Sequence, residues 1–384
     1  MMFAVSVATE NRCCGMVYWC SAAHKLHPQS KSRSNSDTHL SNHPALARSR
    51  CPVFVMGCHR SGTNLLYDIL LSAGGFAVYR GFLPVYEVLI PRVGGLEKPE
   101  NRTKLMEIWL RSKGFRRSGL DAAELSAKVQ RECKTGGDFI RIAMDEIARN
   151  QNVARWAVYE PDNVLHIPEI KADIPEALFI HIIRDGRDIA LSLKKMGGFR
   201  PLPWDRGSRS LQATALYWEW MVRNGQHHGR LFPADYVEVH YEELVREPHR
   251  VLKRLGEFLD HDLDYDRIQS TALGRLQESN SSFLDEQGSK GHPDPVNRWK
   301  ARLAREEVCA LEALVGNCLT DLGYGLTTSE QERKQGLRES WLRSVYPGFL
   351  GTKQWLKTKT PLGRLASLSG LELADPAAQA DSAP

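Results

Sequence analysis

A short apolar run that ends in a loop rich in glycine and hydroxyl side chains constrains the fold of this chain most strongly. Residues 52–57 read Pro-Val-Phe-Val-Met-Gly, which is typical of a strand buried on both faces in a parallel sheet. Residues 64–72, just beyond the loop, carry leucine and isoleucine at helical spacing. The segment therefore predicts a strand that turns directly into a helix.

Further apolar runs alternate with helical patterns along the chain. The runs lie at residues 76–79, 156–159, 177–183 and 236–241. Helical spacing covers residues 211–222 and 251–259, and Asp121-Ala-Ala-Glu124 resembles a capping box that opens another helix. Strands that alternate with helices form parallel units, so we expect a three-layer α/β/α domain around a mostly parallel sheet. Ligands of such sheets bind at the carboxyl ends of the strands.

Composition divides the chain into three parts. Residues 1–50 carry six lysine and arginine residues against two acidic ones, and so account for four of the five net positive charges. This polar segment buries too little surface to offset the entropy of ordering, so we expect a disordered basic tail or a mistaken translation start. We expect the folded domain over residues 51–326. A partly helical extension follows over residues 327–384, with its last residues, 373–384, disordered.

Charge, hydropathy and cysteine content argue against several classes of protein. Beyond residue 50 the charges nearly balance, which argues against a nucleic-acid-binding surface. No apolar stretch approaches the roughly 20 residues of a membrane span, and the first residues lack the pattern of a secretory signal. The eight cysteines show neither a disulfide framework nor the paired spacing of metal ligands. We therefore expect a cytoplasmic protein without a metal site.

The loop between Gly57 and Asn64 has the composition of an anion-binding turn. Backbone N–H groups and the positive end of the helix dipole bind phosphate or sulfate at such a turn. Glycines at 57 and 62 let the backbone approach the anion. The loop also offers one guanidinium and three neutral polar side chains, from Arg60, Ser61, Thr63 and Asn64.

The same loop lacks two central parts of an ATP- or GTP-binding loop. Such a loop carries a lysine for the terminal phosphates, followed by a serine or threonine for magnesium. Here Thr63 and Asn64 occupy those positions. The loop therefore favours a phosphate or sulfate ester that is bound without a metal.

A second passage from strand to helix carries another candidate anion site. Arg184 falls at the end of the run 177–183, and Asp185 and Asp188 suit the first turn of a helix. Ser192 lies one helical turn beyond Asp188, so its hydroxyl and the Arg184 guanidinium could converge on one anion. Alternatively, the arginines at 184 and 187 pair with these aspartates. The residues alone leave both interpretations open.

Together, the two motifs resemble those of the sulfotransferases that use 3'-phosphoadenosine 5'-phosphosulfate (PAPS). In that family the counterpart of residues 60–64 holds the 5'-phosphosulfate, and the counterparts of Arg184 and Ser192 hold the 3'-phosphate. Asn64 replaces the more usual threonine. The Arg-Asp-Gly-Arg form of residues 184–187 is most similar to the tyrosylprotein and bacterial sulfotransferases. The likeness covers residues 51–326 and implies a nucleotide-kinase-like P-loop fold.

The resemblance also implies an activity and further contacts to the nucleotide. The activity is metal-independent transfer of a sulfuryl group from PAPS to a hydroxyl or amine. Likeness extends through residues 240–244, which makes Tyr241 a candidate contact. Arg298, Trp299 and Lys300 follow a polar stretch over residues 279–295 and are candidates to close over the nucleotide. Surface solvation by the two cations and anchoring of the core by Trp299 are the alternatives.

The catalytic base is harder to place than the nucleotide site. Arg60 is the natural stabiliser of charge on the transferring group. Related tyrosylprotein sulfotransferases carry a glutamate soon after the strand that follows the loop, and Glu87 is the nearest one here. The family also has a lysine before a proline at the end of the next strand, where this chain has Glu160 before Pro161. Glu160 and Glu87 are therefore the candidate bases.

The acceptor is not readable from the sequence. An insertion over residues 81–155 would shape its pocket, and peptide tyrosine, carbohydrate, lipid and small alcohol all remain open. Residues 341–365 mix basic and aromatic side chains without an acidic one, so they either lie on an anionic membrane surface or pack on the catalytic body. An Mg-ATP small-molecule kinase and a non-catalytic nucleotide-binding relative are the rival functions.

Overall fold

The computed structural model describes residues 47–195, 210–271, 295–333, 336–368, 371 and 373. Residues from Ala45 onward form one structural unit, and the description below concerns that unit. Most of the expected basic tail, the polar stretch 279–294 and the chain beyond residue 373 lie outside the described residues.

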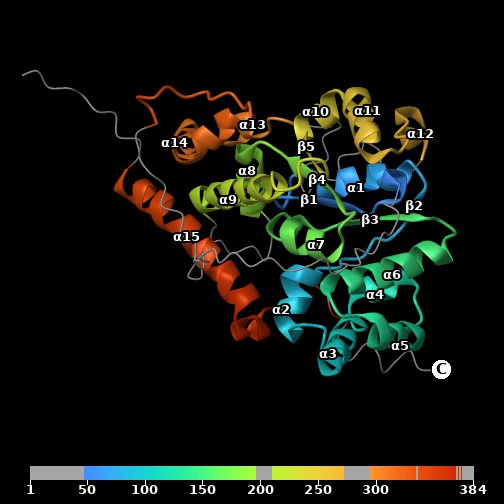
Figure 1. Cartoon of the computed structure of the whole chain (residues 1–384). Helices are drawn as coiled ribbons and strands as arrows, with labels where there is room; N and C mark the ends of the chain where they lie inside the picture. The colour runs from blue at the N-terminus through green and yellow to red at the C-terminus, as the bar shows by residue number, and fades with distance from the viewer. Residues whose placement is uncertain are drawn as a thin grey trace, which may run out of the picture. The chain divides into compact units, whose positions relative to one another are not determined.

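A five-stranded sheet lies at the centre of this unit (Figure 1), and all its neighbouring strands are parallel. The strands are β1 (Val53–Gly57), β2 (Phe76–Ala77), β3 (Arg155–Tyr159), β4 (Leu178–Ile183) and β5 (Tyr236–His240). Their order across the sheet is β2-β3-β1-β4-β5. Every strand falls within or at the edge of an apolar run predicted from the sequence, and the α/β expectation is confirmed.

The strand order places a topological switch at β1. The chain leaves β1 for β2 and β3 on one side, and then continues to β4 and β5 on the other. In the register of the sheet, Val55 pairs with Tyr159 of β3 and Gly57 pairs with Ile182 of β4. The carboxyl ends of β1, β3 and β4 therefore meet at one edge, where ligands of such sheets bind.

Helices cover both faces of the sheet, because side chains alternate along each buried strand. Val53 and Val55 of β1 belong to one core cluster, and Phe54 and Met56 belong to the other. The first cluster includes residues of α1 (Thr63–Ser72), α10 (Tyr241–Arg246), α11 (Pro248–Leu259) and α12 (Tyr265–Ser270). The second includes residues of α7 (Ile167–Asp173), α8 (Gly186–Lys195), α9 (Leu211–Gly229) and α14 (Arg305–Asp321).

The stretch between β2 and β3 adds a group of helices next to this body (Figure 1). It contains η2 (Val85–Leu89), α2 (Ile90–Val93), α3 (Pro99–Trp109), α4 (Lys113–Ser118), α5 (Ala122–Glu132) and α6 (Gly136–Asn150). The Asp121 carboxylate accepts a hydrogen bond from the Glu124 backbone N–H at 2.8 Å, so α5 begins where the capping pattern predicts.

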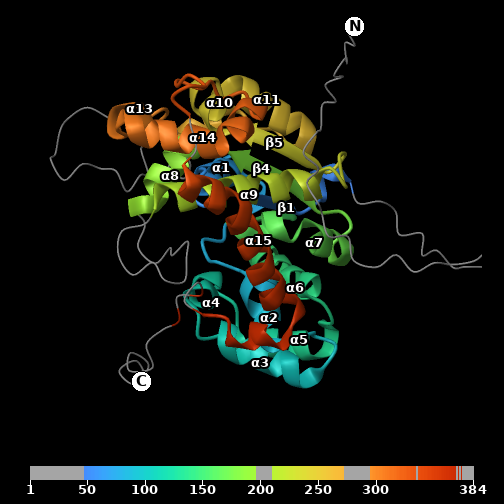
Figure 2. The same cartoon turned by 90° about the vertical axis from the view of Figure 1, so that its left-hand side faces the viewer.

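The chain continues with α13 (Trp299–Arg302), α14, α15 (Leu337–Lys359) and η4 (Pro361–Leu365). Helix α15 lies along α9 and reaches α2 (Figure 2), and Leu342, Tyr346 and Leu350 on it are buried in the second core cluster. Within the described ranges, no helix has the length and apolar content needed to cross a membrane.

Candidate functional site

The turn from β1 to α1, where the sequence predicts an anion site, has two residues with positive φ. Arg60 has a φ of 73° and Gly62 has a φ of 100°, both in the left-handed region. Glycine is required at 62, because a Cβ there would lie 2.6 Å from the Tyr241 ring. Ser61 is fully buried, and its hydroxyl has no hydrogen-bond partner among the residues described. A buried hydroxyl in such a loop is suited to a bound anion.

Side chains of the second motif reach this loop. The Arg60 Nε donates a hydrogen bond to the Ser192 hydroxyl at 3.0 Å. The Arg184 Nη1 donates to the Arg60 carbonyl oxygen at 3.3 Å. The Arg184 guanidinium lies over the Tyr241 ring, 4.3 Å from its centroid. The structure therefore brings Arg60, Arg184, Ser192 and Tyr241 together at the carboxyl edge of the sheet.

The cluster concentrates positive charge. Burial and the neighbouring Arg184 lower the pKa of Arg60, and the same two causes lower the pKa of Arg298. Arg184 itself is buried, and its Nε has no hydrogen-bond partner among the described residues. Its Nη2 donates to the Pro295 carbonyl oxygen at 2.6 Å and lies 3.7 Å from the Asp188 carboxylate. An anion between these cations would relieve their repulsion.

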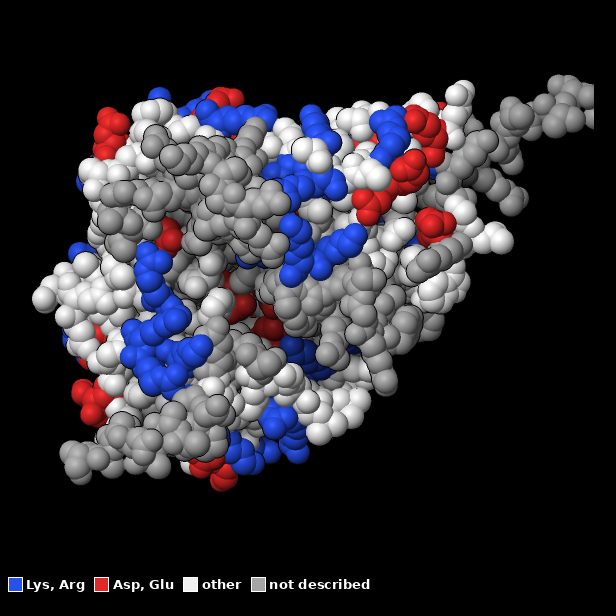
Figure 3. Space-filling view, turned by 180° about the vertical axis from the view of Figure 1, so that it is seen from behind, with Lys and Arg blue, Asp and Glu red and all other residues white. Residues whose placement is uncertain are grey.

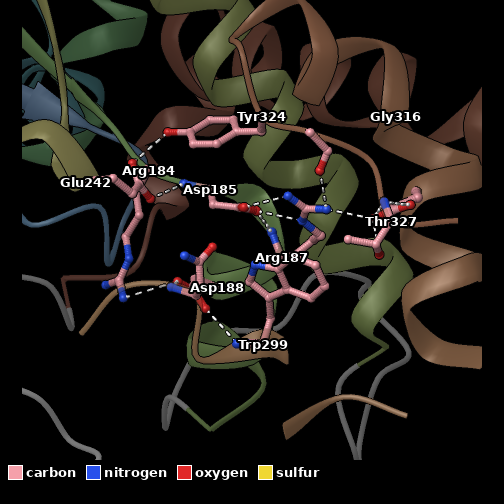
Figure 4. A network of polar contacts seen from close by, with 12 residues as sticks. Arg184, Asp185, Arg187, Asp188, Glu242, Trp299, Gly316, Tyr324 and Thr327 are labelled. Atoms are coloured by element: carbon pink, nitrogen blue, oxygen red, sulfur yellow. Dashed lines mark hydrogen bonds and ion pairs between the residues drawn. The ribbon is translucent and has the colours of Figure 1, made fainter. Parts of the chain in front are cut away.

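Arg187, in contrast, belongs to a buried ionic network (Figure 4). Its guanidinium donates to both oxygens of Asp185, at 3.0 and 2.7 Å, and to Glu312 at 2.6 Å. Glu312 also accepts hydrogen bonds from the backbone N–H groups of Thr327 and Thr328. The alternative ion-pair interpretation thus holds for Arg187, whereas the pair that Arg184 forms with Asp188 is longer, at 3.7 Å.

Asp188 holds the segment that carries Arg298, Trp299 and Lys300. Its carboxylate accepts hydrogen bonds from the backbone N–H groups of Asn297 at 3.0 Å and Trp299 at 2.9 Å. Burial raises the pKa of Asp188 to about 6. The Trp299 ring is buried, with the Arg187 guanidinium 3.9 Å from its centroid. These contacts favour the anchoring role for Trp299.

The remaining residues that the sequence predicts to contact the nucleotide differ in their exposure to solvent. Arg298 is buried beside Arg184, while Lys300 is exposed. In the loop, Thr63 is buried at the start of α1, and Asn64 is exposed. Of these two residues, only Thr63 is therefore enclosed by the protein.

Glu160 lies at the carboxyl end of β3, and its backbone N–H donates to the Val55 carbonyl oxygen of β1 at 3.2 Å. Its side chain is buried, and Oε2 has no hydrogen-bond partner within the described part of the chain. Burial, together with the nearby Asp162 carboxylate, raises the pKa of Glu160 to about 8. A carboxyl group with this pKa accepts a proton more readily than an ordinary one.

A histidine–aspartate pair accompanies Glu160. The His59 Nε2 lies 3.3 Å from an Asp162 carboxylate oxygen. Burial disfavours the imidazolium, but the charge and hydrogen bond of Asp162 outweigh it and raise the pKa of His59 to about 9. Sequence reasoning missed this pair because its members lie 103 residues apart, although Asp162 follows Glu160 by only two positions.

Glu87, the other candidate base, is engaged elsewhere. Its carboxylate pairs with Lys357 of α15, with His166 at 2.9 Å, and accepts from the Gln354 amide at 2.8 Å. Burial alone would raise the pKa of Glu87, but His166 and Lys357 lower it to about 2. Glu87 therefore connects the helical insertion to α15, and its depressed pKa suits an ion pair better than a base.

The surface shows a related distribution of charge. On one face, lysine and arginine side chains lie around a hollow in which acidic side chains are visible (Figure 3). Such a rim attracts an anionic ligand. In the part of the chain that the structure describes, no three His, Cys, Asp or Glu side chains are grouped as metal ligands.

Comparison with known proteins identifies related sequences and structures. A model of the sulfotransferase family matches residues 52–265. No curated protein sequence matches the chain.

Several solved structures are similar to the chain. The sulfotransferase domain of the Synechococcus PCC 7002 olefin synthase has 21% identity over 65% of this chain and 87% of that one, with a TM-score of 0.43. Sulfotransferase STF9 from Mycobacterium avium has 14% identity over 72% and 78% of the two chains, with a TM-score of 0.38. Retinol dehydratase in complex with androsterone and the inactive cofactor PAP has 15% identity over 72% and 82%, with a TM-score of 0.36.

The contacts of Glu87 with Lys357 and Gln354 of α15, called the tether below, predict that the protein loses stability in acid. The pKa of Glu87 lies below its ordinary value of 4.5, so the ionised carboxylate contributes stability above about pH 4.5. That contribution disappears as the pH falls toward 2. We therefore expect the difference in unfolding free energy between wild type and Glu87→Gln to be constant near neutral pH and to shrink below about pH 4.5. Urea denaturation at a series of pH values measures it.

Glu107→Gln, which changes an exposed carboxylate of α3, is the control and should alter stability little at any of these pH values. A Glu87→Gln difference that stayed constant down to pH 2 would contradict the tether.

Proposed function

Because the chain belongs to the sulfotransferase family, whose model matches residues 52–265, we propose that it transfers a sulfuryl group from PAPS to a hydroxyl or amine acceptor. The protein is a transferase of that family. The convergence of two strand-to-helix turns at one edge of the sheet carries the proposal. The first turn contributes Arg60 and Ser61. The second contributes Arg184, and the helix that follows it contributes Ser192. Hydrogen bonds at 3.0 and 3.3 Å join the two segments.

The two turns are suited to the two anionic ends of PAPS. In our proposal, the loop of residues 60–64 binds the 5'-phosphosulfate, and Arg184 with Ser192 binds the 3'-phosphate. Two buried polar atoms support this assignment, because the Ser61 hydroxyl and the Arg184 Nε have no partner among the described residues. Tyr241 packs against both Gly62 and Arg184, so it would hold the two sites at a fixed separation. Arg298 adds a third cation beside Arg184.

Bound PAPS would supply an activated sulfuryl group, and the protein would position the acceptor and remove its proton. Glu160 fits the role of base, since its carboxyl group is buried at the carboxyl end of β3 with one oxygen unpartnered among the residues described. The acceptor proton would pass to that oxygen. Arg60 and protonated His59 lie on the loop and would stabilise negative charge that develops in the transition state.

The rival functions fit less well. An Mg-ATP kinase would need a lysine and a magnesium-binding hydroxyl where the chain has Thr63 and the exposed Asn64. A non-catalytic relative would leave the raised pKa of Glu160 without a use.

Nucleotide preference tests the proposed function directly. We expect 3'-phosphoadenosine 5'-phosphate (PAP) to bind in a calorimetric titration and EDTA to leave its affinity unchanged. Mg-ATP should give no comparable heat, because the loop lacks the lysine and the magnesium-binding hydroxyl of a kinase. Tight binding of Mg-ATP that EDTA abolishes would establish the kinase alternative instead.

The role of Glu160 is tested by Glu160→Gln. We expect this variant to lose turnover and to keep its affinity for PAP, because the amide cannot accept the acceptor proton. In the wild type, turnover should rise with pH through about 8, where the Glu160 carboxylate becomes ionised. PAP release from PAPS, measured with a panel of phenols and sugars, reports turnover.

Glu87→Gln is the matched variant and should retain turnover at neutral pH, since Glu87 is committed to its ion pairs. The opposite pattern, with Glu160→Gln active and Glu87→Gln inactive, would move the base to Glu87.

A further inference from the structure

Large apolar side chains that remain exposed are concentrated on the C-terminal helices. Eight are exposed in the ranges that the structure describes, and six of these lie between residues 337 and 365. These six are Leu337, Trp341, Val345, Trp355, Leu362 and Leu365. Single exposed apolar residues are normal on a protein surface, whereas a concentration on one element marks an interaction surface.

The apolar side chains of α15 form a stripe along the side that faces away from the body. At 100° per residue, Leu337, Trp341, Val345 and Trp355 fall within an arc of about 80°. Trp341 is 53% exposed and Trp355 is 57% exposed. In Figure 2, no other helix or strand lies in front of α15. We call this stripe, together with Leu362 and Leu365 of η4, the outer face.

The opposite side of α15 is fixed to the protein, so the outer face cannot easily turn inward. Leu342, Tyr346 and Leu350 are buried in the core. Arg343 pairs with Glu219 of α9, and Lys357 pairs with Glu87 of η2. Turning the outer face inward would expose this apolar surface and break both partly buried ion pairs.

Charge distinguishes among the partners that such a face could meet. Residues 340–368 contain five lysine and arginine residues and no aspartate or glutamate. Lys359, one helical turn after Trp355, and Arg364, between Leu362 and Leu365, are exposed, and Lys359 also contacts Glu169 at 3.0 Å in a pair open to solvent. The partner must therefore accept apolar and indole side chains together with positive charge.

We propose that the outer face of α15 and η4 binds the surface of a membrane that contains anionic phospholipid. Indole rings favour the boundary between headgroups and acyl chains, where the apolar ring leaves water while its N–H stays hydrated. Cations beside them are attracted to anionic headgroups. A second copy of the chain fits less well, because a two-fold interface over this face would bring the same cations against each other.

Sedimentation of the full-length protein with lipid vesicles tests this proposal. We expect binding to vesicles of phosphatidylcholine mixed with phosphatidylserine, weak binding to phosphatidylcholine alone, and loss of binding at high salt. The double variant Trp341→Ala/Trp355→Ala should bind about tenfold more weakly or worse, because two rings no longer leave water. Arg364→Glu should weaken the preference for phosphatidylserine.

Leu231→Ala is the matched control. Its side chain is 57% exposed, as Trp355 is, but it lies outside the outer face, so the variant should bind vesicles as the wild type does. Circular dichroism and PAP binding should be unchanged in all variants, since none alters the core or the nucleotide cluster.

Failure of the wild type to sediment with either vesicle would overturn the proposal. The proposal would also be wrong if Leu231→Ala reduced vesicle binding as much as Trp341→Ala/Trp355→Ala does. Dimerisation of the wild type that is lost in Trp341→Ala/Trp355→Ala, measured by analytical ultracentrifugation, would assign the face to a second copy instead.

Discussion

The closeness of Arg184, which is buried, and Arg60, which is half-buried, is the constraint on which the site depends. They come from different strand-to-helix turns, and they lie together because β1 and β4 are adjacent in the sheet. Burial and, after it, the positive charge of Arg184 lower the pKa of Arg60. Such an arrangement is stable as a binding site when an anion is shared between the cations. The glycine at 62 and the Tyr241 ring keep the two turns in contact.

The carboxylates around the site contact other groups and leave the positive charge of Arg60 and Arg184 largely unneutralised. Asp185 and Glu312 neutralise Arg187, which makes that arginine a structural residue. Asp188 uses its oxygens mainly on backbone N–H groups and stays farther from Arg184. At the end of the neighbouring strand, Glu160 has no ion partner among the described residues, and burial with the nearby Asp162 carboxylate raises its pKa. The site therefore combines a cationic half suited to a nucleotide with a carboxyl group suited to proton transfer.

Much of this architecture could be predicted from the sequence, because buried parallel strands and phosphate loops have short local signatures. The five strands and the start of α5 follow from such signatures. Contacts between distant segments could not be predicted: Arg187 meets Glu312 across 125 positions, and Glu87 meets Lys357 across 270. For the same reason, sequence alone could not decide between Glu160 and Glu87, whose pKa values are shifted in opposite directions by their surroundings. The anchoring role of Trp299 likewise depends on a contact between distant segments, because its ring lies against the Arg187 guanidinium.

The claim that the two turns bind opposite ends of one nucleotide is tested most directly by comparing two ligands on two proteins. Wild type and Arg184→Ala are titrated calorimetrically with PAP and with adenosine 5'-phosphate, which lacks the 3'-phosphate. The account predicts that Arg184→Ala loses about 2–5 kcal/mol of binding free energy for PAP and little for adenosine 5'-phosphate. An equal loss for both ligands, or no loss for either, would contradict it.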